Sequence, residues 1–453
     1  MGKEAEELFD VNDTVLETER QQRKPKHLNW RPVENQSFSL TIPPTVYPPR
    51  EDTDLMAKRL IQLGPGKGRK FLEIGCGSGA LSILAGSLGW SVHGCDINPF
   101  AVVATRGNLE KNMQTGVILE GGVGPESFPF DTKFDLIIWN LPYIFPDEVS
   151  DVLGPMEEAA LIDTDKVGLY HRLMATVEKN GLLAINGKIL LLARYNSLKS
   201  DGKFAKRIWD IHTFEDGEKL AVYCLWRPYE HADKSYVDVT GSTNDDLMRK
   251  IGIGTHISTR KQTAGKGRRS RKWHSIESSY AGSWIVAEGR DINPGLLQLS
   301  GGLAVLNSIG DDRLKLKWPN DIMIEGRKLC GILVEGRTSN NQTKAVLGIG
   351  INLETKQTKL EGIEISSLAE IKDLSFEELD QRLECEISSL IEYRDDLPPV
   401  DYEKVRSQVL EHMKIYGKPE YQGKVFESFD LNERGELVLE DTVIDDGEDV
   451  NWI

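Results

Sequence analysis

Long apolar runs are missing from this chain of 453 residues. No hydrophobic stretch approaches the ~20 residues needed to cross a bilayer, and the opening segment Met-Gly-Lys-Glu-Ala-Glu-Glu lacks the apolar centre of a signal peptide. The five cysteines show neither a disulfide framework nor the CxxC spacing of a metal site. These absences argue against a membrane-embedded or disulfide-stapled chain, and we expect a cytoplasmic location.

Positive charge is scarce overall but concentrated in one place. Lysine and arginine number 55 against 71 aspartates and glutamates, so the formal net charge of −16 disfavours broad nucleic-acid binding. No acidic residue occurs at positions 247–276, and residues 262–273 read Gln-Thr-Ala-Gly-Lys-Gly-Arg-Arg-Ser-Arg-Lys-Trp. Glycines let backbone N–H groups approach an anion, and arginines add planar donors. The loop therefore indicates an anion site, although composition alone also allows a solvated basic loop.

The length predicts two or three domains. Residues 1–38 lack apolar periodicity, so we expect a disordered leader there, and a short polar stretch that opens with Pro228 marks a boundary. We therefore expect a first domain at 39–228, a linker at 229–235, a second domain at 236–395 and a small β module at 396–453.

In the first domain a short apolar strand at 70–74 runs into Gly75-Cys76-Gly77-Ser78-Gly79, and a second strand ends at Asp96. A strand, a glycine turn, a helix and a strand closed by an acid form the first nucleotide-binding unit of a doubly wound sheet. The acid can accept two ribose hydroxyls. The pattern leaves NAD as an alternative ligand.

Residues 134–143 read as a buried strand that ends in Asn140-Leu141-Pro142-Tyr143. The Asn140 side chain and a proline-fixed backbone carbonyl can accept hydrogen bonds from one planar NH2 group, and Tyr143 can stack on its plane. Such a site orients an amide or exocyclic amine. An ordinary strand-ending turn is the structural alternative.

Together these segments resemble class I S-adenosylmethionine-dependent methyltransferases of amide and amine nitrogens, with Leu141 in place of the first proline of the Asn-Pro-Pro-Tyr signature. Residues 46–53, Val-Tyr-Pro-Pro-Arg-Glu-Asp-Thr, resemble the amino-terminal motif of HemK-like release-factor glutamine methyltransferases. The resemblance implies a Rossmann-like sheet that binds S-adenosylmethionine through Glu73, Gly75, Cys76, Gly77, Gly79, Asp96 and Asn140. It implies a methyl acceptor held by Asn140, Leu141, Pro142 and Tyr143, with Asn140 catalytic.

The implied methyl acceptor is a protein glutamine, as in a release factor. An adenine or guanine amine in nucleic acid is the second choice of acceptor. A separate alternative is that this domain is a binding module that has lost methyl transfer.

In the second half the basic loop stands among four other segments in a fixed order: 241–244, 317–321, 327–335 and 348–352. Their order and spacing resemble the catalytic domain of biotin–protein ligases. The family activity that this implies is attack of the biotin carboxylate on MgATP to give biotinyl-5′-AMP, then transfer to a lysine of a biotin carboxyl carrier protein. Both steps build negative charge on oxygen, which fixed cations stabilise.

By position, Lys328 and Arg268 are the expected catalytic cations. Trp273 and Asn352 would meet adenine, and Mg²⁺ would arrive with ATP near Asp321 without dedicated metal ligands. The full set implied for biotin and its adenylate is Ser242, Thr243, Asn244, Gln262, Gly265, Lys266, Gly267, Arg268, Arg271, Trp273, Asn320, Lys328, Gly331 and Asn352. Lys266 stands where the family has arginine, which keeps the charge but loses the bidentate fork.

For the fold of this half we expect a class II synthetase-like mixed sheet with helices on one face, a helix at 375–393, and a small SH3-like β-barrel at the end. No helix-turn-helix precedes the ligase-like segments, which weighs against a repressor role. A biotin sensor is the alternative to a ligase, and a homodimer is left open.

Overall fold

The computed structural model describes residues 24–123, 128–142, 168–214, 217–276 and 278–453. Tyr143, one of the expected methyl-acceptor residues, lies outside them. The chain divides into a first unit that ends at Trp226 and a second that begins at Arg227, with residues 202–205 assigned to the second. In the described part of the chain no helix is long and apolar enough to span a membrane.

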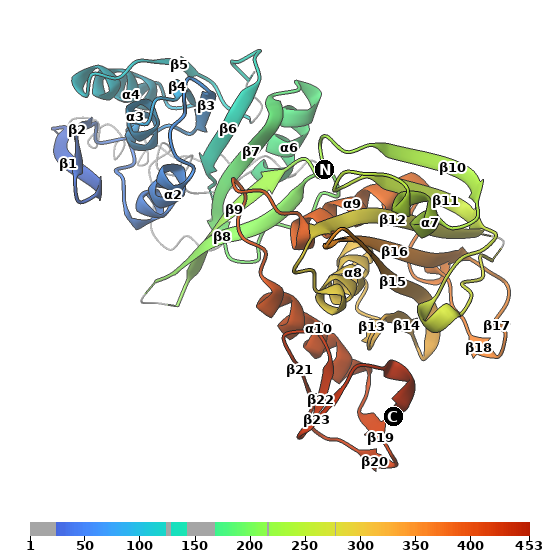
Figure 1. The fold of residues 1–453 in the computed structure, drawn as a ribbon. Helices are drawn as coiled ribbons and strands as arrows, with labels where there is room; N and C mark the ends of the chain where they lie inside the picture. The colour runs from blue at the N-terminus through green and yellow to red at the C-terminus, as the bar shows by residue number, and fades with distance from the viewer. Residues whose placement is uncertain (1–23, 124–127, 143–167, 215–216, 277) are drawn as a thin grey trace, which may run out of the picture. The chain divides into compact units, whose positions relative to one another are not determined.

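The first unit is built on a seven-stranded sheet in the order β5-β4-β3-β6-β7-β9-β8 (Figure 1). Its strands are β3 (Lys70–Ile74), β4 (Ser91–Asp96), β5 (Gly116–Glu120), β6 (Phe134–Asn140), β7 (Leu183–Arg194), β8 (Ala205–Thr213) and β9 (Lys219–Trp226). Neighbours from β5 to β7 run parallel, and β9 is antiparallel to β7. Strand order reverses between β3 and β6, and ligands of such doubly wound sheets bind at the carboxyl ends of the strands at this switch point.

Helices of the first unit are α2 (Glu51–Gln62), α3 (Ala80–Ser87), α4 (Pro99–Lys111) and α6 (Leu169–Lys179). The start of α4 is coded locally: Pro99 takes the first position and the Asn98 side chain accepts from the Phe100 N–H. The central parallel strands β3 and β6 are almost wholly buried, as is usual where helices cover both faces of a parallel sheet.

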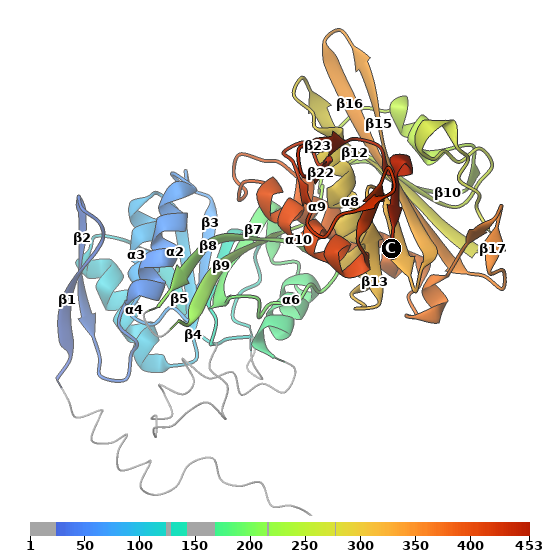
Figure 2. The same cartoon turned by 90° about the horizontal axis from the view of Figure 1, so that it is seen from below.

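The expected disordered leader is wrong from residue 26 onward. Strands β1 (Lys26–Val33) and β2 (Gln36–Ile42) form an antiparallel hairpin that lies beside α4, as Figure 2 shows. Trp30 and Phe38 are buried, and the Trp30 indole N–H donates to Asp54 at 2.7 Å. Two aromatic residues eight positions apart are too few to form an apolar periodicity in the sequence. Their burial could therefore be seen only in the structure.

The second unit holds another seven-stranded sheet, in the order β10-β11-β12-β16-β15-β14-β13. The strands are β10 (Lys234–Thr240), β11 (His256–Gln262), β12 (Ser278–Gly289), β13 (Leu314–Lys317), β14 (Asp321–Ile324), β15 (Arg327–Ser339) and β16 (Gln342–Glu354). The β10–β11 pair is parallel and the other neighbouring pairs of this sheet are antiparallel, so the sheet is mixed, as expected.

Helices cover both faces of this sheet, not one. Helices α8 (Pro294–Ile309) and α9 (Phe376–Ile391) pack on the face that carries Trp284. The short α7 (Thr243–Met248) packs its Leu247 against Ile285 and its neighbours on the other face. Successive residues of a strand point to opposite faces, so adjacent Trp284 and Ile285 serve different cores.

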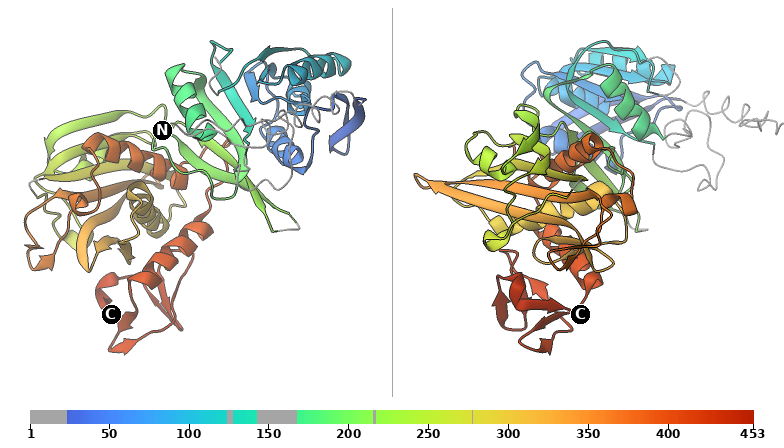
Figure 3. Two further views of the ribbon diagram at one scale, coloured as in Figure 1. Left: turned by 180° about the vertical axis from the view of Figure 1, so that it is seen from behind. Right: turned by 90° about the vertical axis from the view of Figure 1, so that its right-hand side faces the viewer.

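After α9 the chain continues through α10 (Tyr402–Tyr416) into a small module that contains the carboxyl terminus (Figure 3). Its strands form two three-stranded sheets: β19 (Pro419–Tyr421), β20 (Lys424–Val425) and β24 (Val450–Trp452), then β21 (Asp430–Leu431), β22 (Leu437–Leu439) and β23 (Thr442–Ile444). Strands β17 (Lys359–Leu360) and β18 (Ile363–Glu364) form a separate two-stranded sheet.

The expected linker at 229–235 is part of the second unit. Tyr229 is buried in its core, and its backbone N–H donates to Glu392 of the segment after α9 at 3.1 Å. Strand β10 begins at Lys234, whose ammonium pairs with Glu384 at 2.8 Å. A polar, proline-led composition resembles a linker, but these contacts hold the segment in place.

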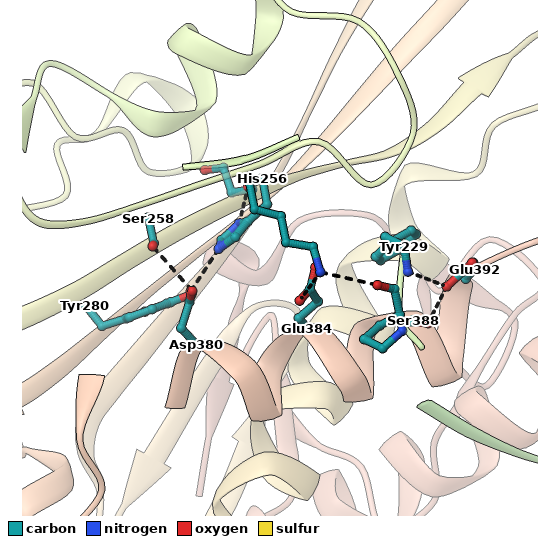
Figure 4. A network of polar contacts seen from close by, with 11 residues as sticks. Tyr229, His256, Ser258, Tyr280, Asp380, Glu384, Ser388 and Glu392 are labelled. Atoms are coloured by element: carbon teal, nitrogen blue, oxygen red, sulfur yellow. Dashed lines mark hydrogen bonds and ion pairs between the residues drawn. The ribbon is translucent and has the colours of Figure 1, made fainter. Parts of the chain in front are cut away.

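A buried polar network ties strands β11 and β12 to helix α9 (Figure 4). The His256 ring stacks on Trp284 at 4.2 Å, with Nε2 2.9 Å from Asp380 and Nδ1 2.8 Å from the Ser283 carbonyl. The Tyr280 hydroxyl donates to Asp380 at 2.6 Å. Burial would raise the pKa of Asp380, but hydrogen bonding and the charge of His256 bring it below its usual value. The network fixes β11, the strand that ends at Gln262, against β12 and α9.

Candidate functional sites

The glycine turn of the first unit lies at the switch point of its sheet. Gly75, Gly77 and Gly79 have φ of 64°, 50° and 77°, which L side chains rarely adopt. A Cβ on Gly79 would also lie 2.8 Å from Thr105. The Cys76 sulfur accepts from the Thr105 hydroxyl, and burial raises the pKa of its thiol, so it is a packing residue and not a nucleophile.

Two acids flank this turn. Asp96 accepts from the Gly77 and Asn98 backbone N–H groups, each at 2.9 Å, so it braces the turn from the end of β4. Glu73 is buried and accepts from the Ser82 hydroxyl at 2.5 Å. Burial raises the pKa of Glu73 to about 8, which keeps this acid mostly protonated at neutral pH.

Asn140 stands at the carboxyl end of β6, beside the turn across the switch point. Its Nδ2 donates to Asp52 of α2 at 2.8 Å. Its Oδ1 is buried and has no hydrogen-bond partner among the described residues. Leu141 and Pro142 are buried, and the Leu141 N–H donates to the Leu192 carbonyl. The site presents one unsatisfied oxygen acceptor held in a fixed position.

The second unit contains a cavity of about 470 Å³, within the range of small-molecule sites. Most of the residues expected at a biotin and adenylate site line it: Ser242, Thr243, Asn244, Gln262, Lys266, Gly267, Arg268, Arg271, Trp273, Asn320, Asp321, Lys328 and Gly331. Gly265 and Asn352 are not part of the lining. The fold thus brings the dispersed segments of the sequence to one site.

A polar network occupies one end of this cavity. Gln262 Oε1 accepts from both the backbone N–H and the hydroxyl of Thr243, at 2.8 and 3.1 Å. The Ser283 hydroxyl lies 2.6 Å from Thr243 Oγ1 and from Asn244 Oδ1. Asn244 in turn donates to Glu335 at 2.8 Å. Ser242 caps α7 and lines the cavity from that position.

The floor of the cavity is a pair of glycines. Gly331 of β15 and Gly350 of β16 are direct cross-strand partners. The Trp273 indole lies on them. A Cβ added to Gly331 would lie 3.0 Å from the indole ring, and one added to Gly350 would lie 2.6 Å from it. Only glycine leaves space for a flat ring at both positions. The Trp273 Nε1 is buried with no hydrogen-bond partner among the described residues.

One cation, the Lys328 ammonium, lies beside the Trp273 ring. Lys328 Nζ lies 5.9 Å from the Trp273 ring centre and 2.7 Å from Asp321. Asn352 donates to the Lys328 and Ser366 carbonyls at 3.3 and 3.1 Å, so it holds the backbone of Lys328 from behind. In the described residues no group of three His, Cys, Asp or Glu side chains is placed to hold a metal ion.

Comparison with known proteins agrees with both halves of this description. The model of the biotin/lipoate A/B protein ligase family matches residues 236–352, and that of ribosomal protein L11 methyltransferase matches residues 53–144. The chain carries a biotin/lipoate-type ligase domain behind a methyltransferase-type domain.

Curated relatives match each domain separately. The bifunctional ligase/repressor BirA of Escherichia coli is 36% identical over 131 residues, 27% of this chain and 40% of that protein. The biotin–[acetyl-CoA-carboxylase] ligase of Paracoccus denitrificans is 33% identical over 25% of this chain and 52% of its own. A putative protein N5-glutamine methyltransferase of Methanocaldococcus jannaschii is 34% identical over 25% of this chain and 54% of its own. The chain therefore spans about half the length of these relatives.

Among solved structures, the biotin protein ligase of Aquifex aeolicus in complex with biotin and ATP covers 49% of this chain and 95% of its own, at 24% identity and a TM-score of 0.37. The ribosomal protein L11 methylase of Lactobacillus delbrueckii covers 40% and 81%, at 19% identity and a TM-score of 0.28.

An acidic turn from the carboxyl-terminal module also lines the ligase cavity, and sequence reasoning missed it. Arg268 donates to the Asp445 carbonyl at 3.3 Å, and its guanidinium is 4.0 Å from the buried Asp446. Arg269 and Arg271 form ion pairs with Asp446 and Glu448. Burial lowers the pKa of Arg268, while the charge of Asp446 opposes this shift. A separation of 177 residues left no local signal for this contact.

Lys266 is engaged differently from the arginines of the loop. Its ammonium lies 2.5 Å from Asp245 and 3.6 Å from Glu335. The hydrogen bond to Asp245 raises the pKa of Lys266. The lysine thus ties the loop to α7 and β15 at the polar end of the cavity. An ammonium suffices for this role, because a single positive charge meets the two carboxylates and no bidentate fork is needed.

Proposed function

We propose that the chain is a bifunctional enzyme. Its ligase domain attaches biotin to a lysine of a biotin carboxyl carrier protein at the expense of ATP, and its methyltransferase domain methylates the side-chain amide of a protein glutamine. The observation that carries the first proposal is the cavity in which the basic loop, Trp273 and Lys328 converge. The second rests on the unsatisfied Asn140 oxygen beside the glycine turn.

In the ligase reaction the biotin carboxylate attacks the α-phosphate of MgATP, giving biotinyl-5′-AMP and pyrophosphate. The ε-amine of the acceptor lysine then attacks the carbonyl carbon and AMP leaves. Negative charge grows on the α-phosphate and departing pyrophosphate oxygens in the first step, and on the carbonyl and departing AMP oxygens in the second. Lys328 and Arg268 supply fixed positive charge for it. Asp321 is the acid beside Lys328 that would meet a magnesium ion carried by ATP.

The remaining ligase residues would bind the substrates and shield the adenylate from water. Thr243, Asn244 and Gln262 offer donors and acceptors to the ureido ring of biotin, while Trp273 supplies a flat apolar surface for a ring. The basic loop would cover the anhydride and keep water away until an amine arrives.

In the methyltransferase reaction S-adenosylmethionine supplies an electrophilic methyl group on sulfur. The residues present fit this cosubstrate: the glycine turn allows close approach of the backbone, and Asp96 stands where ribose hydroxyls would be accepted. The Asn140 oxygen would accept from the acceptor NH2 group and so direct the nitrogen lone pair to the methyl carbon. The net charge of −16 favours a protein acceptor over nucleic acid.

Incubation of the purified chain with MgATP, labelled biotin and a carboxyl carrier domain tests the ligase proposal. We expect label on the carrier lysine and none when that lysine is changed to arginine. Biotin binding without label on the carrier would instead identify a sensor.

Labelled S-adenosylmethionine, offered separately with a release factor and with total RNA, tests the methyl acceptor. We expect the label on a glutamine of the protein. Label on RNA would establish the nucleic-acid alternative, and cofactor binding with no transfer to either would indicate a binding module.

We also propose a class II synthetase-like assignment for the ligase core, an SH3-like barrel for the carboxyl-terminal module and a cytoplasmic location. The mixed sheet and the paired three-stranded sheets support the first two. The five cysteines, whose spacing in the sequence forms no disulfide framework, support a reducing compartment.

A further inference from the structure

Asp52 is a buried acid that the proposed chemistry does not yet use. It is 5% exposed at the start of α2, in the segment that joins the hairpin to the sheet. Four donors point at its carboxylate. Oδ1 accepts from the Thr53 backbone N–H at 2.6 Å and the Thr53 hydroxyl at 3.2 Å, whereas Oδ2 accepts from the Asn140 amide at 2.8 Å and the Tyr47 hydroxyl at 3.3 Å.

The contact between Asp52 and Asn140 has only one chemically acceptable orientation. A carboxylate accepts hydrogen bonds and donates none, so the NH2 end of the Asn140 amide must face it. Rotating the amide by half a turn would set its oxygen against Asp52 Oδ2 and bury two acceptors in contact, which is costly away from water. The other end of the amide, Oδ1, is the buried oxygen that lacks a partner among the described residues.

We propose that Asp52 is a positioning residue that locks the Asn140 amide with its oxygen toward the methyl acceptor and so makes the site selective for NH2-bearing groups. This inference rests on the proposed amide methylation at Asn140. An amide or exocyclic amine can donate to that oxygen, whereas a carboxylate would be repelled by it. The lock therefore separates glutamine from glutamate, two side chains of nearly the same shape.

Asp52→Asn is the informative variant because it preserves shape. The short Thr53 N–H bond retains the oxygen of the new side chain on the Thr53 side, so its NH2 group faces Asn140. The Asn140 amide must then turn its oxygen to that NH2 group and present its own NH2 group to the acceptor. We expect the preference between acceptors to reverse.

The experiment measures binding of two release-factor peptides that differ only in glutamine or glutamate at the acceptor position, in the presence of S-adenosylhomocysteine. Wild type should bind the glutamine peptide at least 10-fold more tightly, and Asp52→Asn should lose or invert this ratio. Asp52→Ala should abolish the preference and reduce kcat for methyl transfer roughly 10- to 100-fold, the usual effect of removing a partner that orients a site group. Affinity for S-adenosylhomocysteine should stay within about two-fold in every variant.

Asp54→Asn is the matched control. It changes the same residue type on the same helix, and Asp54 accepts from the Trp30 indole and not from Asn140. We expect wild-type selectivity from it. An Asp52→Asn protein that folds, binds the cosubstrate analogue and keeps the wild-type glutamine preference would overturn the inference.

A second measurement keeps the outcome separate from the proposed function. The side-chain NH2 protons of Asn140 should be protected from exchange in ¹⁵N NMR spectra of the wild type and unprotected in Asp52→Ala. If no acceptor binds or is methylated but this protection is seen, amide methylation fails while the lock stands. Exchange rates that are unchanged by Asp52→Ala would refute the lock itself.

Discussion

Lys328 brings a positive charge to the ligase cavity, and its ammonium forms an ion pair with Asp321 at 2.7 Å. The backbone beneath it is fixed by Asn352. Asn352 was expected to contact adenine, and its position makes it a support for Lys328 in this structure. The role of each residue in turnover stays a prediction.

Changing Lys328 to alanine should lower biotin-dependent ATP–pyrophosphate exchange by about 10²-fold or more, because a fixed cation at developing negative charge is worth several kcal/mol. Biotin affinity should change far less. Lys315→Ala is the control, since Lys315 lies on β13 and its ammonium donates to the Asp312 carbonyl. The double variant with Asp321→Asn shows whether the loss comes from the lysine or from an unpaired carboxylate. Retention of the wild-type exchange rate by Lys328→Ala would remove Lys328 from the mechanism.

Glu73 gives a pH dependence of stability whose sign is set by burial. Its pKa rises from 4.5 to about 8 in the folded protein, so the folded state holds a proton that the unfolded state releases. Stability from this group is therefore complete below pH 4.5, falls as the pH rises toward 8 and is level above that. At 1.36 kcal/mol per pKa unit the full effect is roughly 5 kcal/mol.

Glu73→Gln keeps an acceptor for Ser82 and cannot ionise. We expect it to raise the melting temperature of the methyltransferase transition at pH 8 and to leave it nearly unchanged at pH 5. The methyltransferase transition is identified as the unfolding transition whose melting temperature changes when S-adenosylmethionine is added. Glu110→Gln, at an exposed position on α4, should give no such difference. An equal effect of Glu73→Gln at both pH values would contradict the argument.

At the scale of elements, the acidic turn at 445–448 and the basic loop form one feature. The carboxylates of Asp446 and Glu448 form ion pairs with Arg269 and Arg271. Phosphate oxygens of a bound nucleotide would compete for the same arginines. The Glu448 pair is largely exposed, and such pairs contribute about 0.2–1 kcal/mol.

Glu448→Gln should therefore lower KM for ATP by about two- to five-fold in the exchange assay, and this KM should rise more steeply with salt because the site carries one less negative charge. Glu440→Gln in the same module, which loses its pair with Lys424, should leave KM unchanged. A rise in KM would mean that the carboxylate arranges the arginines for the substrate and does not compete with it.

At the scale of the whole molecule, each unit contains a complete set of candidate residues of its own. We expect Asn140→Ala to abolish methyl transfer and leave biotin transfer within about two-fold of wild type. Lys328→Ala should do the converse. Loss of both activities in either folded variant would show that the two reactions are coupled.

Much of each site was readable from the sequence because its chemistry is local. The turn at 75–79 follows its strand directly, and thirteen of the residues expected around the ligase site line one cavity. The hairpin at 26–42, the buried Tyr229 and helix α10 were not predicted. Each depends on a few apolar side chains whose burial is decided by distant partners.

The amino-acid sequence by itself determined which local pieces exist: the glycine turn, the strand that ends at Asn140, and the cationic loop before Trp273. Backbone preference and short-range periodicity carry that information. Only the tertiary structure decided that Asp52 meets Asn140 across 88 residues, and that Gly331 and Gly350 form a floor for Trp273. Donor–acceptor matching and close packing act between neighbours in space, and those neighbours exist only after the sheets have formed.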